Sequence, residues 1–226
     1  MISPSDREAA VLDSLPKDNL VLIGGYAVNA YVPPRFSIDC DLVVIGGGKE
    51  VEAQLQEQGF RKSQVKDPAG YIRYHRGAEK IAFDLLFGSV LDRQTGVSFE
   101  SELFERLSSR RTTLGRISST RITMRIANPE LLVAMKFVSG RKQDVRDVFM
   151  LVGTRLELNE IYNLISIKCS PELITKRTGE FRKMVVGSQE YRDSLQGPYG
   201  KMPDETFNSL VSKFGNFLRD LQGSSY

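Results

Sequence analysis

Residues 21–45 constrain the fold most, because short apolar segments alternate there with glycine and proline breaks. Residues 21–25 (VLIGG) predict a short buried strand followed by a sharp turn. Residues 26–32 (YAVNAYV) predict the first turns of a helix that a pair of prolines ends. Residues 39–45 predict a second strand. This pattern favours a fold in which a strand, a short helix and a second strand follow one another closely.

The second of these strands carries two carboxylates on the same face. Successive side chains of a strand point to opposite faces, so Asp39 and Asp41 project to one side. Cys40 and Leu42 project to the other side. Two like charges so close repel each other unless a positive group lies between them, and Mg²⁺ or Mn²⁺ prefers oxygen ligands of this kind. The pair therefore predicts a metal and phosphate site.

A third carboxylate, that of Asp84, lies inside the apolar run IAFDLLF, which predicts a buried strand. Burying a lone charge is costly, so this acid needs a partner. The preceding run YIRYHR predicts another strand, and the short GAEK segment between the two runs predicts a hairpin. Asp84 is therefore expected to lie near Asp39 and Asp41 and to complete the metal site.

The remaining pattern predicts an α/β part followed by a helical part. The expected fold is α/β (α+β), with a small mixed sheet flanked by helices over residues 1–126 and a helical C-terminal domain over residues 127–226. The further elements expected are a strand over 60–65, a helix over 99–109, a hairpin leading to a final strand over 110–127, and helices over 129–140, over 141–153 and from 158 onward.

Composition is that of a globular protein, with 41% hydrophobic and 26% charged residues. No apolar run approaches the roughly 18 residues of a spanning helix, and the polar start MISPSDREAA is unlike a signal peptide. A cytoplasmic protein without membrane contact is expected. Cys40 and Cys169 lie in unrelated contexts and predict reduced thiols. A single histidine, His75, disfavours a histidine-rich zinc site.

Positive charge gathers in one part of the chain. Residues 106–146 contain ten basic residues against two acidic ones, an excess of eight positive charges in a chain whose net charge is +3. Such an excess suits a ligand that carries phosphates, although a solvated surface gives the same pattern. The ten residues are Arg106, Arg110, Arg111, Arg116, Arg121, Arg125, Lys136, Arg141, Lys142 and Arg146.

Taken together, the motifs GGYAV and RFSIDCDL, the apolar strand around Asp84 and the later KQDVRDV helix resemble the nucleotidyltransferase superfamily related to DNA polymerase beta. Within it, roughly residues 20–150 are most similar to the AbiEii-type toxin and minimal nucleotidyltransferase branch. The resemblance implies the nucleotidyltransferase fold. It also implies an enzyme that uses two divalent ions to move an NMP from an NTP, such as ATP, to an acceptor hydroxyl. Asp39, Asp41 and Asp84 would hold these ions.

In the AbiEii-like families a lysine and a later aspartate of the helical part are also functional. The matching positions here are Lys136 and Asp144, with Arg141 and Asp147 nearby. Lys136 interrupts an apolar helical stripe, which suits a role for its ammonium group. A lysine that extends from the edge of the stripe to solvent gives the same pattern.

Four further residues are expected to bind the nucleotide. Gly24 and Gly25 let backbone amides approach a triphosphate that a side chain would obstruct. Arg35 and Ser37 match the Arg and Ser/Thr positions before the carboxylates in related enzymes. A loop salt bridge and a local turn explain the same two residues without a ligand. Gly25 itself departs from the family, in which many members have serine at this position.

Three functions remain open on the sequence alone. The first is a nucleotidyltransferase acting on an acceptor, and the basic run favours RNA, such as a tRNA end, over a partner protein, and disfavours a cationic drug. The second is a nucleotide-binding regulatory or antitoxin-like module that binds or modifies a partner protein of a toxin–antitoxin pair. The third is an RNA-binding domain without catalysis. Three clustered acids favour the first.

Overall fold

The structure is a computed structural model that describes residues 4–37, 39–63, 71–77, 81–114, 121–185 and 189–223 of the chain. The chain forms two compact units, and each is considered by itself. The first unit comprises Met1–Ala30, Pro34–Leu91 and Ser98–Asn128, and the second comprises Tyr31–Pro33, Asp92–Val97 and Pro129–Tyr226.

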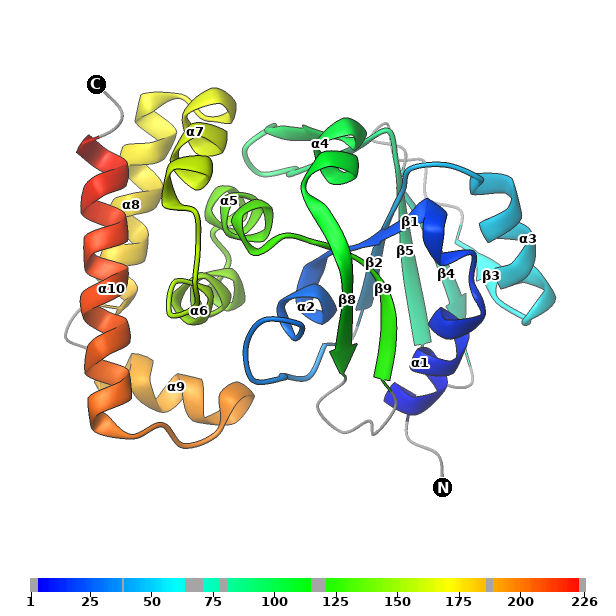
Figure 1. Cartoon of the computed structure of the whole chain (residues 1–226), viewed down its shortest axis with the longest axis horizontal. Helices are drawn as coiled ribbons and strands as arrows, with labels where there is room; N and C mark the ends of the chain where they lie inside the picture. The colour runs from blue at the N-terminus through cyan, green and yellow to red at the C-terminus, as the bar shows by residue number, and fades with distance from the viewer. Residues whose placement is uncertain are drawn as a thin grey trace. The chain divides into compact units, whose positions relative to one another are not determined.

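A mixed sheet forms the centre of the first unit. Its strands are β1 (Leu20–Leu22), β2 (Asp39–Val44), β3 (Arg61–Lys62), β4 (Tyr71–Arg76), β5 (Ile81–Phe87), β8 (Ser108–Leu114) and β9 (Arg121–Ala127). They lie side by side in the order β3-β4-β5-β2-β1-β9-β8 (Figure 1). Strand β2 runs parallel to β5, and β1 runs parallel to β9, whereas the other neighbouring strands are antiparallel. A separate antiparallel pair consists of β6 (Ser89–Leu91) and β7 (Ser98–Glu100).

Short helices connect and cover these strands. They are α1 (Pro4–Ser14), the 3₁₀ helix η1 (Lys17–Asn19), α2 (Gly24–Val28), α3 (Gly48–Glu57) and α4 (Ser101–Arg106). Helix α1 packs against β9, and α2 packs against β2. Helix α3 buries Val51 and Leu55 completely. The apolar side chains of β2 and β5 lie in the core, where the Phe60 and Phe83 rings meet edge to face at 5.3 Å. One face of the sheet therefore packs in the core, and the side chains of Asp39, Asp41 and Asp84 lie on the opposite face of β2 and β5.

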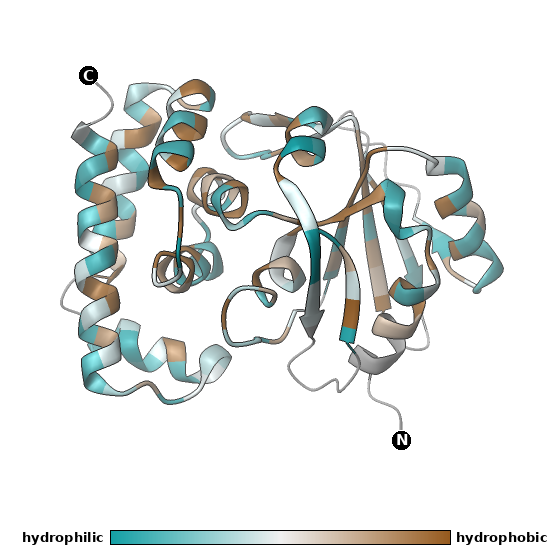
Figure 2. Ribbon diagram, in the orientation of Figure 1, coloured by the Kyte–Doolittle hydropathy of each residue, from teal (hydrophilic) through white to brown (hydrophobic). Residues whose placement is uncertain are grey.

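The described part of the second unit is helical. Its helices are α5 (Pro129–Ser139), α6 (Lys142–Leu151), α7 (Leu158–Lys168), α8 (Pro171–Val185), α9 (Gln189–Tyr199) and α10 (Asp204–Gly223). Aromatic contacts hold them together, since the Phe149 ring lies 5.5 Å from that of Phe214 and the Phe137 ring 5.2 Å from that of Phe181. Brown and teal alternate along α10 in Figure 2, as expected for a helix with one buried face.

The last carbonyls of α5 are satisfied by one buried side chain. The Arg177 guanidinium donates from Nε to the Val138 carbonyl at 2.9 Å and from Nη2 to the Ser139 carbonyl at 3.2 Å. Gly140, at φ 63°, ends the helix. An added Cβ at Gly140 would lie 2.8 Å from the Arg177 guanidinium carbon, so this end of α5 requires glycine.

The observed architecture confirms the predicted fold class, a mixed sheet with helices followed by a helical part. The strands predicted over 71–76 and 81–87 are present with those bounds, and the helix predicted over 129–140 ends one residue earlier, at Ser139. None of the helices in the described part of the chain combines the length and hydropathy that a membrane span requires.

Several boundaries differ from the prediction. Helix α2 ends at Val28 and does not continue to the prolines, because the Asn29 side chain instead pairs with the backbone of Arg35. Helix α4 ends at Arg106, since residues 108 and 109 already belong to β8. The predicted strand over 60–65 is limited to β3, and residues 64 and 65 lie outside the described part. The β6–β7 pair was not predicted.

Candidate active site

The three predicted metal ligands occupy one face of two adjacent strands. Asp41 of β2 and Asp84 of β5 are cross-strand partners in the parallel ladder. Partners in register point to the same face, and Asp39, two residues before Asp41, shares it. Cys40 and Leu42 are fully buried on the other side. The alternation predicted from the sequence therefore places these carboxylates as neighbours.

Asp84 obtains its counter-charge from an arginine on the next strand. Arg73 of β4 lies opposite Asp84 in the antiparallel β4–β5 ladder. Its Nε donates to Asp84 Oδ1 and its Nη2 to Asp84 Oδ2, both at 2.7 Å. The same Nη2 lies 3.2 Å from Asp39 Oδ1. Only 4% of Asp84 is exposed, so this bidentate ion pair compensates a carboxylate that water hardly reaches.

Electrostatics at Arg73 and Tyr71 follow from these contacts. The hydrogen bond to the Asp84 carboxylate raises the pKa of the Arg73 guanidinium, so its charge is permanent. Burial, and then the hydrogen bond to Asp84, raises the pKa of the Tyr71 hydroxyl to about 12. Tyr71 therefore remains a neutral donor to Asp84 at physiological pH.

The two glycines lie where the other predicted residues meet. Gly24 has a φ of 68°, and an added Cβ there would overlap Asp41 Oδ2. An added Cβ on Gly25 would overlap Ser37 Oγ and lie 2.9 Å from Arg35 Nη2. The start of α2 thus requires glycine because side chains from β2 and from the loop before it occupy the adjacent space.

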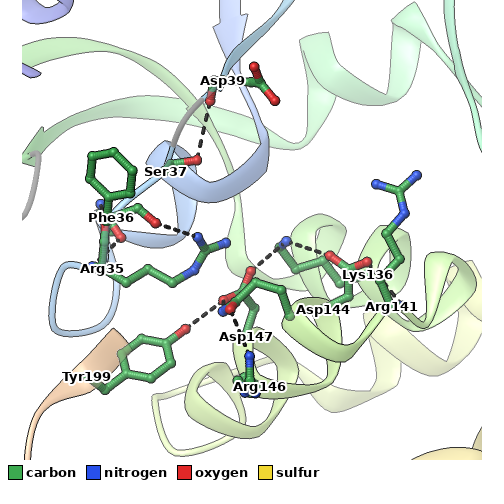
Figure 3. Close-up of polar contacts among 12 residues, drawn as sticks. Arg35, Phe36, Ser37, Asp39, Lys136, Arg141, Asp144, Arg146, Asp147 and Tyr199 are labelled. Carbon is green, nitrogen blue, oxygen red and sulfur yellow. Dashed lines mark hydrogen bonds and ion pairs between the residues drawn. The ribbon is translucent and has the colours of Figure 1, made fainter. Parts of the chain in front are cut away.

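The loop before β2 is fixed by local hydrogen bonds. Asn29 Nδ2 donates to the Arg35 carbonyl at 2.9 Å, and the Arg35 amide donates to Asn29 Oδ1 at 3.0 Å. Arg35 Nη1 donates to the Phe36 carbonyl, and Ser37 Oγ donates to the Asp39 carbonyl at 3.3 Å (Figure 3). Half of Phe36 is exposed, although it lies between these two anchored residues.

In the second unit, Lys136 of α5 and Asp144 of α6 form a buried cluster. The Lys136 ammonium lies 3.0 Å from Asp144 Oδ1 and 2.6 Å from Asp147 Oδ2 (Figure 3). Asp147 is completely buried, and its Oδ1 accepts hydrogen bonds from Gln143 Nε2 at 3.0 Å and from Tyr199 OH at 2.6 Å. The predicted pair of Lys136 and Asp144 is therefore in contact, and Asp147 and Tyr199 complete it.

The predicted residues thus fall into two groups. Gly24, Gly25, Arg35, Ser37 and the three acids belong to the first unit, and Lys136 and Asp144 belong to the second. Sequence reasoning missed Arg73 as the partner of Asp84 and gave Tyr199 no role. For Arg73 a signal was present, because the alternation of YIRYHR and the short segment after it fix its partner on β5.

The basic run is divided among several elements. Arg110 of β8 and Arg125 of β9 are cross-strand partners, so both point to one face of this hairpin. Arg110 Nη1 lies 3.1 Å from Asp18 Oδ1, with 63% of the arginine side chain exposed. Arg116 lies outside the described residues.

The acids do not form a ready-made metal site. Within the described ranges, no group of three or more His, Cys, Asp or Glu side chains is placed so that it could hold a metal ion. Their donor chemistry nevertheless fits a hard divalent cation, since all three ligands are carboxylates on one sheet face. A cationic group, the Arg73 guanidinium, already lies between two of them.

No protein-family model matches the sequence, and no curated protein matches it. Solved structures that match along nearly the whole chain include the following two. JHP933 from Helicobacter pylori is 14% identical, with 98% of this chain and 91% of that chain covered and a TM-score of 0.48. MenT4, a nucleotidyltransferase toxin from Mycobacterium tuberculosis H37Rv, is also 14% identical, with 98% and 88% covered and a TM-score of 0.49.

Replacing Lys136 with alanine is expected to destabilise the protein. The change leaves Asp147 buried without its ammonium partner, and breaking a buried ion pair costs about 3–5 kcal/mol. Urea unfolding measures the loss. The matched control is Lys142→Ala on α6, where the side chain is exposed and the expected change is within about 0.5 kcal/mol. A Lys136→Ala variant as stable as the control would contradict the buried cluster.

Replacing Gly25 with alanine is expected to strain the loop before β2. The new Cβ would overlap Ser37 Oγ, and overpacking of this kind costs about 1–3 kcal/mol. Chemical unfolding measures the stability of Gly25→Ala. Gly77→Ala is the matched control, because no described atom lies within 4 Å of a Cβ added at Gly77. Equal stability of the two variants would show that Gly25 is not closely packed.

Proposed function

We propose that the protein is a metal-dependent nucleotidyltransferase that moves an NMP from an NTP to an acceptor hydroxyl. One observation supports this most strongly: three carboxylates, from Asp39, Asp41 and Asp84, share a face of two parallel strands beside a close-packed glycine pair. Three carboxylates on one sheet face do not stabilise a protein core, because burying charged side chains is costly and core packing favours apolar ones. A site that binds divalent metal ions does require such a group of carboxylates.

Asp39, Asp41 and Asp84 would hold Mg²⁺ or Mn²⁺ through their carboxylate oxygens. When bound, such ions polarise a phosphoryl group, lower the pKa of an attacking hydroxyl and neutralise a pyrophosphate leaving group. Asp84, which lies opposite Asp41 in the β2–β5 ladder, would also assist deprotonation of the acceptor hydroxyl.

The chain's own groups would orient the triphosphate. Arg35 and Ser37 carry a guanidinium and a hydroxyl to the space beside Gly25, and both groups donate hydrogen bonds of the kind that phosphate oxygens accept. A larger residue at Gly25 would fill this space. Arg35 is 7% exposed, its backbone pairs with the Asn29 side chain and its Nη1 donates to the Phe36 carbonyl, so little of its conformational freedom remains to be lost on binding.

Lys136 would bind a phosphate oxygen, with Asp144 as its partner. Two carboxylates already hold its ammonium at 3.0 Å or less, so this role requires Lys136 to exchange one of them for a phosphate oxygen. Asp144 is the partner more easily exchanged, because Asp147 is fully buried and lies closer.

RNA is the acceptor that the charge pattern favours. The β8–β9 hairpin places Arg110 and Arg125 side by side, and Arg121 is exposed on the same hairpin. Arginines in such a row bind phosphates, and a polynucleotide supplies them in series. A tRNA end is a suitable acceptor because it carries a free hydroxyl, and a protein of a toxin–antitoxin pair is the alternative.

Incubation with each NTP labelled at the α-phosphate, Mg²⁺ and total cellular RNA tests this function. We expect label in RNA, with one NTP preferred, and none in excess EDTA. Asp41→Asn should lower the rate by more than the roughly 10–100-fold that loss of a residue supporting a metal ligand costs. Asp13→Asn is the control, since Asp13 is an exposed carboxylate on α1 that pairs with Lys17.

Unchanged labelling in EDTA, or a wild-type rate for Asp41→Asn, would refute metal-dependent transfer. Label that appears in protein and not in RNA would make a partner protein the acceptor. Absence of label from every acceptor, with NTP binding retained, would favour the nucleotide-binding regulatory module.

A further inference from the structure

Arg73 is placed as a cation inside the group of acids. Its guanidinium forms two parallel hydrogen bonds of 2.7 Å with Asp84 and lies 3.2 Å from Asp39. One positive group therefore bridges carboxylates from β2 and β5, the two strands that carry all three acids. A divalent ion bound by the same carboxylates would need the same oxygen atoms.

The Arg73 guanidinium and the Asp84 carboxylate are matched in shape. A planar guanidinium fits a carboxylate through two parallel bonds, which a lysine ammonium cannot reproduce. Asp84 is 4% exposed, whereas 37% of the Arg73 side chain is exposed. The acid is thus fixed in the sheet, and the arginine is the partner with a path to solvent.

We propose that Arg73 is an internal counter-ion that holds Asp39 and Asp84 in the metal-free protein, and that it must release them before these carboxylates bind a divalent ion. The inference rests on the proposed function, because it assigns Arg73 to the same metal site. It explains why that site is not preformed within the described residues. Metal binding then competes with an ion pair, and the apparent affinity equals the intrinsic affinity multiplied by the fraction of molecules in which Arg73 has released the acids.

Mn²⁺ titration of the full chain, followed by calorimetry and by the paramagnetic resonance signal of free Mn²⁺, tests the competition without any substrate. Arg73→Gln removes the charge and should bind Mn²⁺ about tenfold more tightly than wild type, or more. Arg73→Lys keeps the charge but loses the bidentate fit, so its affinity should lie between the two. Without metal, Arg73→Gln should have a lower melting temperature than wild type. Saturating Mn²⁺ should raise the melting temperature of Arg73→Gln by more than it raises that of wild type.

The matched control is Arg61→Gln on β3. Arg61 is exposed and is the cross-strand partner of His75, so its loss removes one positive charge from a neighbouring strand without touching the acids. Its Mn²⁺ affinity should stay within about twofold of wild type, since exposed charges are screened. An equal gain in Arg61→Gln and Arg73→Gln would reduce the effect to net charge and overturn the inference.

Other outcomes separate this inference from the function on which it rests. Wild-type Mn²⁺ affinity in both Arg73 variants would overturn the counter-ion role and leave the metal site intact. Weaker binding in both variants would also overturn it, because Arg73 would then support the metal. Absence of Mn²⁺ binding in wild type and every variant would refute the metal site itself, and the inference with it. If Arg73→Gln does not fold without metal, the Arg73→Lys titration decides the matter alone.

Discussion

Asp84 lies within a sheet, 4% exposed, and a carboxylate so placed needs a cation beside it. The first unit meets this requirement through strand pairing. The β4–β5 ladder sets Arg73 opposite Asp84, and the parallel β2–β5 ladder sets Asp41 on the other side. The sheet order therefore determines which charges face each other, and the packing of the opposite face holds that order in place.

The second unit also contains a buried carboxylate that is paired with a cation. Lys136 lies between Asp144 and Asp147 as Arg73 lies between Asp39 and Asp84, so the described part of each unit contains a cation that contacts two carboxylates. The difference is in the additional donors. Asp147 is fully buried and accepts bonds from Gln143 and Tyr199, which suits a permanent structural pair. Asp39 is 42% exposed in its side chain, which leaves it accessible to a ligand.

Much of the first site could be predicted from the sequence, and the limits have physical causes. Alternation on a strand placed Asp39 and Asp41 together, and the four-residue GAEK segment is enough to pair Arg76 with Ile81 and hence Arg73 with Asp84. The pairing of Asp41 with Asp84 could not be predicted in this way, because β2 and β5 are distant in sequence and no turn fixes their register. Tyr199 was unpredictable for the same reason, since only the packing of α9 brings it to Asp147.

When the protein binds its nucleotide, a divalent ion is expected to take the place of Arg73 among the acids. The most direct measurement is a crystal structure of the wild-type protein with Mn²⁺ and a non-hydrolysable NTP, with Mn²⁺ located by anomalous scattering. We expect Mn²⁺ at coordination distance from oxygens of Asp39, Asp41 and Asp84, with the Arg73 guanidinium turned away from Asp84. Saturating Mn²⁺ with Arg73 still bidentate to Asp84 and no metal among the three acids would contradict it.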